Sequence, residues 1–317
     1  MERELWSEAL RDYSNIINEY PLRALSYYKR GEVYRILEEY ENAIENFKMA
    51  SELNSTQEVY QTAIYSIAQR IAQEADEARG RDDYNTAIPK YIEAISYYPE
   101  FTQAYFNLAF SFFKLSDFEN AKKYLLKNIE IDPNQSQSLK MLADIYKGEG
   151  QFNDAITFYK KATEVNPNYF KAYYSLATLL ITTDIDKAKE YLKKVVSIEP
   201  KYPKGHETLG IVNMQLEIYD EAIQNFHEAV NLSSKSYKSY YLLAEIYNLK
   251  GDYEIAKNYA KSSLQIKSRK NGAAFFHLGV AEKNLGNGPA AKDAFVKAKS
   301  DKTWRASADY ELNLMET

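Results

Sequence analysis

The sequence is poor in the residues that build metal, redox and nucleophilic sites. Its 317 residues include no Cys and only three His, so disulfides, thiolate metal sites and a cysteine nucleophile are excluded. No pair among His206, His227 and His277 has the spacing of a metal-binding helix, and no Gly-rich phosphate loop is present. We therefore expect no metal, no cofactor and no catalytic residue in this chain.

Glycine, proline and long apolar runs are also scarce. Eleven Gly and eight Pro form no flexible linker, and no apolar run is long enough to span a bilayer. The N-terminal segment is acidic and amphipathic, unlike a secretory signal. The 40 basic and 45 acidic residues are interspersed and give a net charge of −5, which argues against nucleic acid and membrane insertion. We expect a cytoplasmic protein, or a periplasmic one if an export signal has been removed.

Repetition is what the chain has in abundance. An Ala recurs every 33–35 residues, except for a step of 44 between Ala43 and Ala87. The recurring residues are Ala9, Ala43, Ala87, Ala121, Ala155, Ala188, Ala222, Ala256 and Ala291. Most are followed after four positions by a bulky residue and after three more by an apolar or small one, which marks one face of a helix. Five of these helices are predicted to stop at Pro21, Pro99, Pro133, Pro167 and Pro200.

A second helical motif precedes each of these helices. In AYFNLAFSFFKL it consists of Tyr105, Leu108, Ala109 and Phe112, which are a large residue, Leu, a small residue and another large one. Gly31 and Gly210 take the place of the small residue in other copies. A small residue there allows two helices to approach closely, and the short links between the motifs predict antiparallel neighbouring helices.

This pattern resembles the tetratricopeptide repeat (TPR) family along the whole chain. The resemblance implies an all-α fold, an α-α superhelix in the form of a right-handed TPR solenoid, with 1–317 as a single domain. We expect a half repeat at 2–20, which either caps the solenoid or has lost residues upstream. About eight helix pairs follow at 24–56, 57–99, 102–135, 136–169, 170–202, 203–236, 237–270 and 272–303, with a capping helix at 304–315.

The second pair carries about ten extra residues, EADEARGRDD, around 74–83. This charged insertion either extends the first helix of the pair or forms a projecting loop. We interpret it as a solvated insertion in preference to a binding element.

The resemblance implies a ligand groove lined by positions 2, 5, 9 and 12 of each first helix, counted from the start of each pair. Position 5 holds Tyr28, Phe106, Lys140, Tyr174, Glu207, Tyr241 and Phe276, and Phe110 and Phe113 widen the aromatic cluster. Such aromatic residues suit the binding of a peptide, although they would equally pack between neighbouring helices. Position 2 holds Lys171, Lys204 and Lys238, which favour an acidic segment or a free carboxylate unless they form only a solvated face.

We therefore predict a non-catalytic scaffold that binds a peptide or protein segment with acidic and aromatic or apolar residues. The alternative is a substrate-targeting or assembly region of a larger enzyme or cell-envelope complex. Co-chaperones of this family bind C-terminal carboxylates through a set that begins with Lys and Asn at positions 5 and 9. Here Lys140 is followed by Asp144, so that ligand is disfavoured. The oligomeric state is left open.

Overall fold

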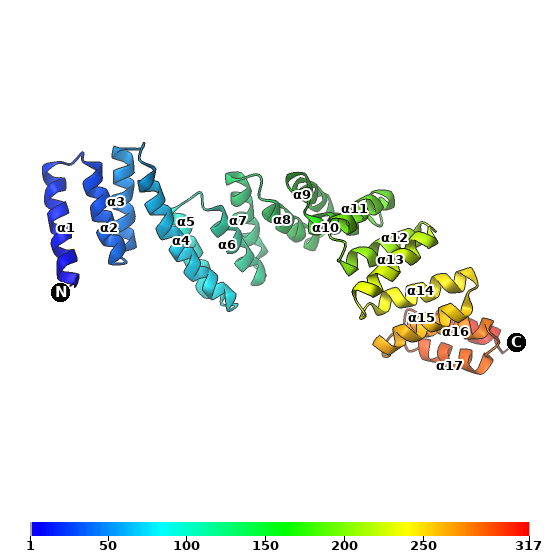
Figure 1. Cartoon of the computed structure of the whole chain (residues 1–317). Coiled ribbons are helices and arrows are strands. Elements are labelled where there is room, and N and C mark those ends of the chain that lie inside the picture. The colour runs from blue at the N-terminus through cyan, green and yellow to red at the C-terminus, as the bar shows by residue number, and fades with distance from the viewer. Residues whose placement is uncertain (1, 317) are drawn as a thin grey trace. The chain divides into compact units, whose positions relative to one another are not determined.

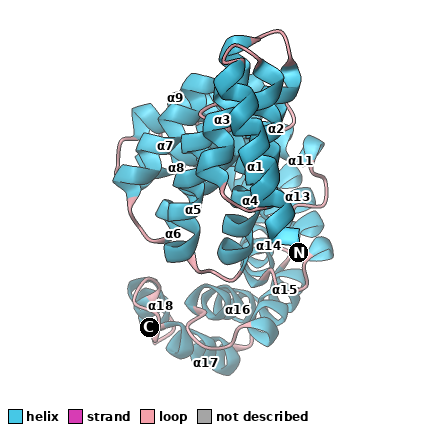
Figure 2. Ribbon diagram, turned by 90° about the vertical axis from the view of Figure 1, so that its left-hand side faces the viewer, coloured by secondary structure: helices cyan, strands magenta, loops and turns pink. Residues whose placement is uncertain are grey.

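The computed structural model describes residues 2–316, which contain eighteen α-helices and no strand (Figures 1 and 2). This confirms the predicted all-α fold. The chain forms two compact units, Met1–Phe158 and Tyr159–Thr317, and the boundary between them falls within α9 (Phe152–Val165). The prediction of one domain over 1–317 stays a prediction, as does the superhelical path.

The first unit contains a single helix followed by helix pairs that pack side by side. Its helices are α1 (Glu2–Glu19), α2 (Ala24–Ile36), α3 (Tyr40–Leu53), α4 (Glu58–Gly80), α5 (Tyr84–Tyr97), α6 (Thr102–Lys114), α7 (Phe118–Ile131) and α8 (Ser136–Gly148). Each first helix begins within one residue of its expected start. The N-terminal helix α1 packs against α2, as expected of a half repeat.

The second unit repeats the arrangement. After α9 come α10 (Phe170–Leu180), α11 (Ile185–Ile198), α12 (Pro203–Gln215), α13 (Tyr219–Leu232), α14 (Tyr237–Lys250), α15 (Tyr253–Ile266), α16 (Gly272–Asn284), α17 (Gly288–Ala298) and α18 (Arg305–Leu314). The last helix, α18, packs on α17 at the place predicted for a capping helix.

In seven of the eight pairs the core contains the repeated bulky residue of the second helix; the exception is α15, where the buried residue at this position is Ala260. The buried anchors are Phe47, Tyr91, Leu125, Tyr159, Leu192, Phe226 and Phe295, all without exposed surface. Where a proline was predicted to stop a helix, the helix ends two residues before it; α7, for example, ends at Ile131 ahead of Pro133. Fully burying a large apolar side chain contributes about 1.5–3 kcal/mol, so each anchor stabilises its pair appreciably.

Each of the three Phe anchors faces a glycine of the first helix. Ala177 packs in one cluster with the smaller anchor Leu192. Where the anchor is Phe226, the small residue is Gly210, and a Cβ added at Gly210 would lie only 2.7 Å from the Phe226 ring. The prediction that this position allows close approach is therefore confirmed.

In seven of the eight pairs, the link between the two helices contains one residue with a left-handed backbone. Gly251 supplies it in one pair with φ 83°, whereas Glu38, Asp82, Ser116 and Glu217 adopt φ near 60° without the freedom of glycine. Between α10 and α11 no described residue has a positive φ, and this repeat is one residue shorter than its neighbours.

The insertion of the second pair is helical, which decides between the two alternatives left by the sequence. Helix α4 has 23 residues where α6 has 13. Its added turns are not simply solvated, because Ala75 and Ala78 are buried. The interpretation of 74–83 as a solvated insertion is thus wrong for part of the segment.

The packing of Gly210 yields a stability prediction. Replacing Gly210 with Ala improves helix propensity by about 1 kcal/mol, but overpacking a rigid core costs about 1–3 kcal/mol. Because the clash is with the fully buried Phe226 ring, we expect Gly210→Ala to lower the melting temperature measured by circular dichroism.

The double variant Gly210→Ala with Phe226→Leu should be more stable than Phe226→Leu alone, because the smaller Leu side chain leaves room for the added methyl group. Gly148→Ala is the control, because a Cβ there meets no atom within 4 Å. Equal melting temperatures for Gly210→Ala and Gly148→Ala would contradict this account of the packing.

Candidate functional site

Two of the lysines predicted at position 2 lie together in the second unit. Lys204, at the start of α12, and Lys238, at the start of α14, line one hollow of about 440 Å³. Lys235, from the link before α14, lines it too and was missed by the sequence reasoning. We call the hollow formed by Tyr202, Pro203, Lys204, Glu207, Ser233, Lys235, Ser236, Tyr237 and Lys238 the lysine hollow.

The three ammonium groups of the lysine hollow have no carboxylate partner among the described residues. The one carboxylate in the hollow, Glu207, accepts a hydrogen bond from Ser239 Oγ at 2.8 Å. The hollow therefore carries an excess of positive charge, unlike the chain as a whole. The third predicted lysine, Lys171, does not line the hollow; it is exposed and stands over the Phe170 ring.

The predicted aromatic residues of the second unit are half-buried, and each packs on other aromatic rings. The ring of Tyr174 meets that of Tyr202 edge-on at 5.4 Å, and its hydroxyl lies 3.2 Å from Thr208 Oγ1. Tyr241 lies beside Tyr237, and burial raises the pKa of Tyr241 to about 12. Phe276 packs against Phe295 and Trp304. Packing between helices, the structural alternative for this row, therefore accounts for much of each ring's surface.

The position-5 residues of the first unit show the same behaviour. Tyr28 contacts Phe47 and Tyr60, and Phe106 packs in the apolar cluster that contains Leu125. Lys140 is held by Asp144 in an ion pair of 2.6 Å along α8, so it is not a free cation.

The two other aromatics predicted for the groove are also half-buried. Phe110 lies beneath the Arg79 guanidinium and the Lys114 ammonium group, 5.8 and 5.5 Å from the ring centre. Phe113 meets Phe118 edge-on. The two rings therefore have neighbours within their own unit.

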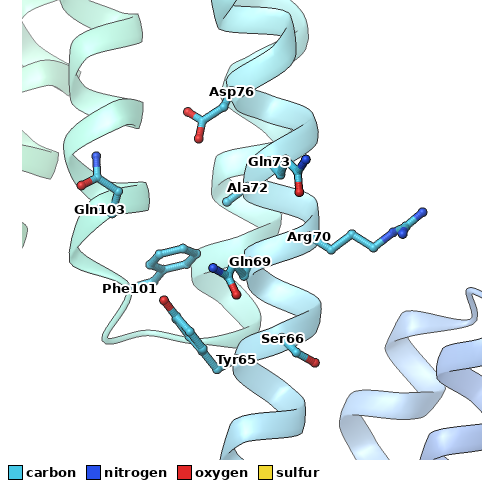
Figure 3. A pocket seen from close by; sticks show the side chains of 9 residues that line it. All are labelled: Tyr65, Ser66, Gln69, Arg70, Ala72, Gln73, Asp76, Phe101 and Gln103. Carbon is cyan, nitrogen blue, oxygen red and sulfur yellow. The ribbon is translucent and has the colours of Figure 1, made fainter.

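A second hollow lies in the first unit and was not predicted. Its volume is about 520 Å³, and Figure 3 shows that it is bounded by α4 and the start of α6. Its lining, which we call the amide hollow, consists of Tyr65, Ser66, Gln69, Arg70, Ala72, Gln73, Asp76, Phe101 and Gln103. The signal in the sequence was the 44-residue step, because the longer α4 supplies Gln73 and Asp76.

No group of side chains suited to a metal ion occurs within residues 2–316. His206 is half-buried, with Nε2 bonded to the Pro200 carbonyl. His277 is buried beside Trp304 with Nε2 3.3 Å from a Glu245 carboxylate oxygen. None of the described helices combines the length and the apolar character needed to cross a membrane.

Comparison with known proteins identifies the family. A model described as tetratricopeptide repeat matches residues 24–57, 102–135, 170–202 and 237–270, and one described as TPR repeat matches 143–181. Together they cover just over half of the chain, so the protein belongs to the tetratricopeptide repeat family. Both models describe a structural repeat and not an enzyme.

Three similar proteins illustrate how widely the repeat is used. TPR repeat-containing protein YpiA of Bacillus subtilis is 26% identical over 72% of this chain and 52% of its own length. Human mitochondrial import receptor subunit TOM70 is 24% identical over 75% of this chain and 39% of its own. The chain thus spans about half or less of these relatives. The crystal structure of YrrB, a TPR protein with an unusual peptide-binding site, has a TM-score of 0.52 at 19% identity and covers 59% of this chain and 97% of its own.

The burial of Tyr241 gives a pH prediction. Its pKa in the folded state lies near 12, above the usual value of 10.0, because burial disfavours the phenolate. The unfolded chain therefore ionises first, so the stability contributed by the neutral phenol is complete below pH 10 and is lost between pH 10 and 12.

We expect Tyr241→Phe to lose less stability over this interval than the wild type, as measured by urea unfolding at each pH. Tyr20→Phe, at an exposed tyrosine, is the control. If both variants followed the wild-type curve, Tyr241 would not be buried as described.

Proposed function

We propose that this chain is a non-catalytic scaffold that binds an acidic segment of another protein in the lysine hollow. One observation carries the proposal: Lys204, Lys235 and Lys238 line the same hollow without a carboxylate partner among the described residues. An acidic segment would supply the missing counter-charges. Tyr202 and Tyr237 beside them offer surface for an apolar or aromatic residue of the same segment.

The magnitudes favour such a ligand. Two opposite charges about 4 Å apart near a protein surface attract by roughly 4 kcal/mol before desolvation is counted. Several such contacts, less the cost of ordering the lysine side chains, are enough for a specific but reversible complex. The chain has a net charge of −5, so the positive charge of the lysine hollow is a local feature of its surface.

Similar proteins support a role in binding polypeptides. TOM70 is a mitochondrial import receptor subunit, and YrrB is a TPR protein with an unusual peptide-binding site. Neither protein identifies a partner for this chain, because the ligand of a repeat protein depends on its surface side chains and not on its fold. The expected location in the cytoplasm stays a prediction.

The alternative, a targeting or assembly region of a larger enzyme or cell-envelope complex, uses the same surface. Capture from a lysate of the source cells separates the two functions. An acidic partner that stays unmodified supports a scaffold, whereas a partner that is processed by another chain supports a targeting region.

Charge reversal in the lysine hollow tests the proposal. We expect Lys204→Glu with Lys238→Glu to weaken the binding of the captured partner's acidic segment by about a hundredfold, since each lost charge contact is worth roughly tenfold. The measurement is fluorescence anisotropy with a labelled synthetic peptide, and raising the salt concentration should weaken wild-type binding.

The matched control is Lys193→Glu, because Lys193 is exposed on α11 and does not line the hollow. Unchanged affinity of the double variant, with wild-type circular dichroism, would overturn the role of the lysine hollow. Equal weakening by Lys193→Glu would point to a general effect of net charge instead.

A further inference from the structure

The longer helix α4 supplies most of the lining of the amide hollow. Along this helix Tyr65, Gln69, Gln73 and Asp76 lie within three turns, and Gln103 faces them from the start of α6. In Figure 3, Asp76, Phe101 and Gln103 lie in the space between the two helices, whereas Arg70 extends away from it. One side of the hollow, which we call its wall, is thus formed by α4, and the first turn of α6 forms the opposite side.

The wall is fixed in place by a hydrogen-bond network around Asp76. Its Oδ1 accepts hydrogen bonds from the Tyr91 hydroxyl at 2.5 Å, from Asn107 Nδ2 at 2.8 Å and from the Arg79 guanidinium at 3.1 Å. These donors come from α5, α6 and α4 itself. Because Tyr91 is a fully buried anchor, the added turns of α4 are joined to the core of their pair. A ligand therefore meets a preorganised surface.

Several polar groups of the hollow have no hydrogen-bond partner among the described residues. These are the amides of Gln69 and Gln73, the Tyr65 hydroxyl and Asp76 Oδ2, while Gln103 uses only its Nε2, which donates to Asn107. Each glutamine amide offers donors and an acceptor in one plane. A peptide group has the same complement, one N–H and one C=O.

The spacing of the amides matches an extended chain. Gln69 and Gln73 are four residues apart on α4, and so lie about 6 Å apart along the helix axis. In an extended chain, groups that point to the same side repeat every two residues, or about 6.6 Å. Consecutive glutamines can therefore bond to main-chain groups of alternate residues. At the lower end, the edge-to-face pair of Tyr65 and Phe101 provides an apolar contact for a side chain.

Charge does not select the ligand here. Asp76 is paired with Arg79, and Arg70 with Glu38 at 3.2 Å. The hollow is therefore close to neutral, in contrast to the lysine hollow.

We propose that the amide hollow is a second binding site, which takes an uncharged, extended polypeptide segment through its main chain. The segment runs along α4, with Gln69 and Gln73 bonded to alternate peptide groups. This inference extends the proposed role in polypeptide binding but requires neither the lysine hollow nor an acidic ligand.

The test begins with the full chain carrying Lys204→Glu and Lys238→Glu, so that the lysine hollow cannot contribute. A displayed library of random peptides about ten residues long is panned against it in about 0.5 M NaCl, where exposed charge contacts are screened. We expect peptides without net charge to be selected. Adding Gln69→Ala and Gln73→Ala should weaken their binding at least about tenfold, the loss expected for one or two hydrogen bonds. Both glutamines are exposed, so the fold should be retained, and circular dichroism checks this.

Two controls make the outcome specific. Gln61→Ala, on the same helix but outside the hollow, should leave the affinity unchanged. N-methylation of the selected peptide at alternate residues should weaken binding, whereas methylation at the intervening residues should not. The proposal would be overturned if none of the selected peptides depended on Gln69 and Gln73 for binding. It would also be overturned if N-methylation weakened binding equally at alternate and at intervening residues. The proposed function is tested separately, by measuring how acidic peptides bind to the chain with intact lysines.

Discussion

The close contact between a small residue of each first helix and the anchor of its partner helix is the constraint on which the rest of the structure depends. At Gly210 and Phe226 this contact is so tight that a single methyl group would not fit. Such a contact fixes both the distance between the helices and their rotation. Once the rotation is fixed, position 2 of the first helix must lie outside the core. The contact thus determines where Lys204 and Lys238 project.

The position-5 aromatic residues of the second unit contribute more to packing between helices than to a surface for a ligand. Tyr174, Tyr202 and Tyr241 are half-buried, and their contacts with other rings contribute to the packing of helices in the second unit. A ring that already contacts its neighbours has less surface left for a ligand, and truncating it would also disturb the packing of the helices. The lysines have no such structural task. Their charges therefore remain available to a partner.

Most of the fold could be predicted from the sequence, because each element rests on local signals. Residue spacing alone predicts where the first helices start. The backbone geometry of proline predicts where second helices end, as α7 does ahead of Pro133. The sites were less predictable. Lys204 and Lys238 followed from the repeat, whereas Lys235 lies in a link whose path the pattern does not fix. The network at Asp76 depends on Tyr91 and Asn107, which are 15 and 31 residues away and meet it only through packing.

The two hollows also explain why family membership does not name a ligand. In a repeat fold each pair contacts mainly its neighbours, so stability is close to a sum of local terms. A surface residue such as Gln73 or Lys238 can therefore change without cost to distant pairs, while Gly210 cannot change without affecting its own core. Within one chain this separation permits a charged hollow and a neutral one. A ligand of the charged hollow would gain most from long-range attraction and lose it in salt, whereas a ligand of the neutral hollow would rely on short, directional hydrogen bonds that salt leaves intact.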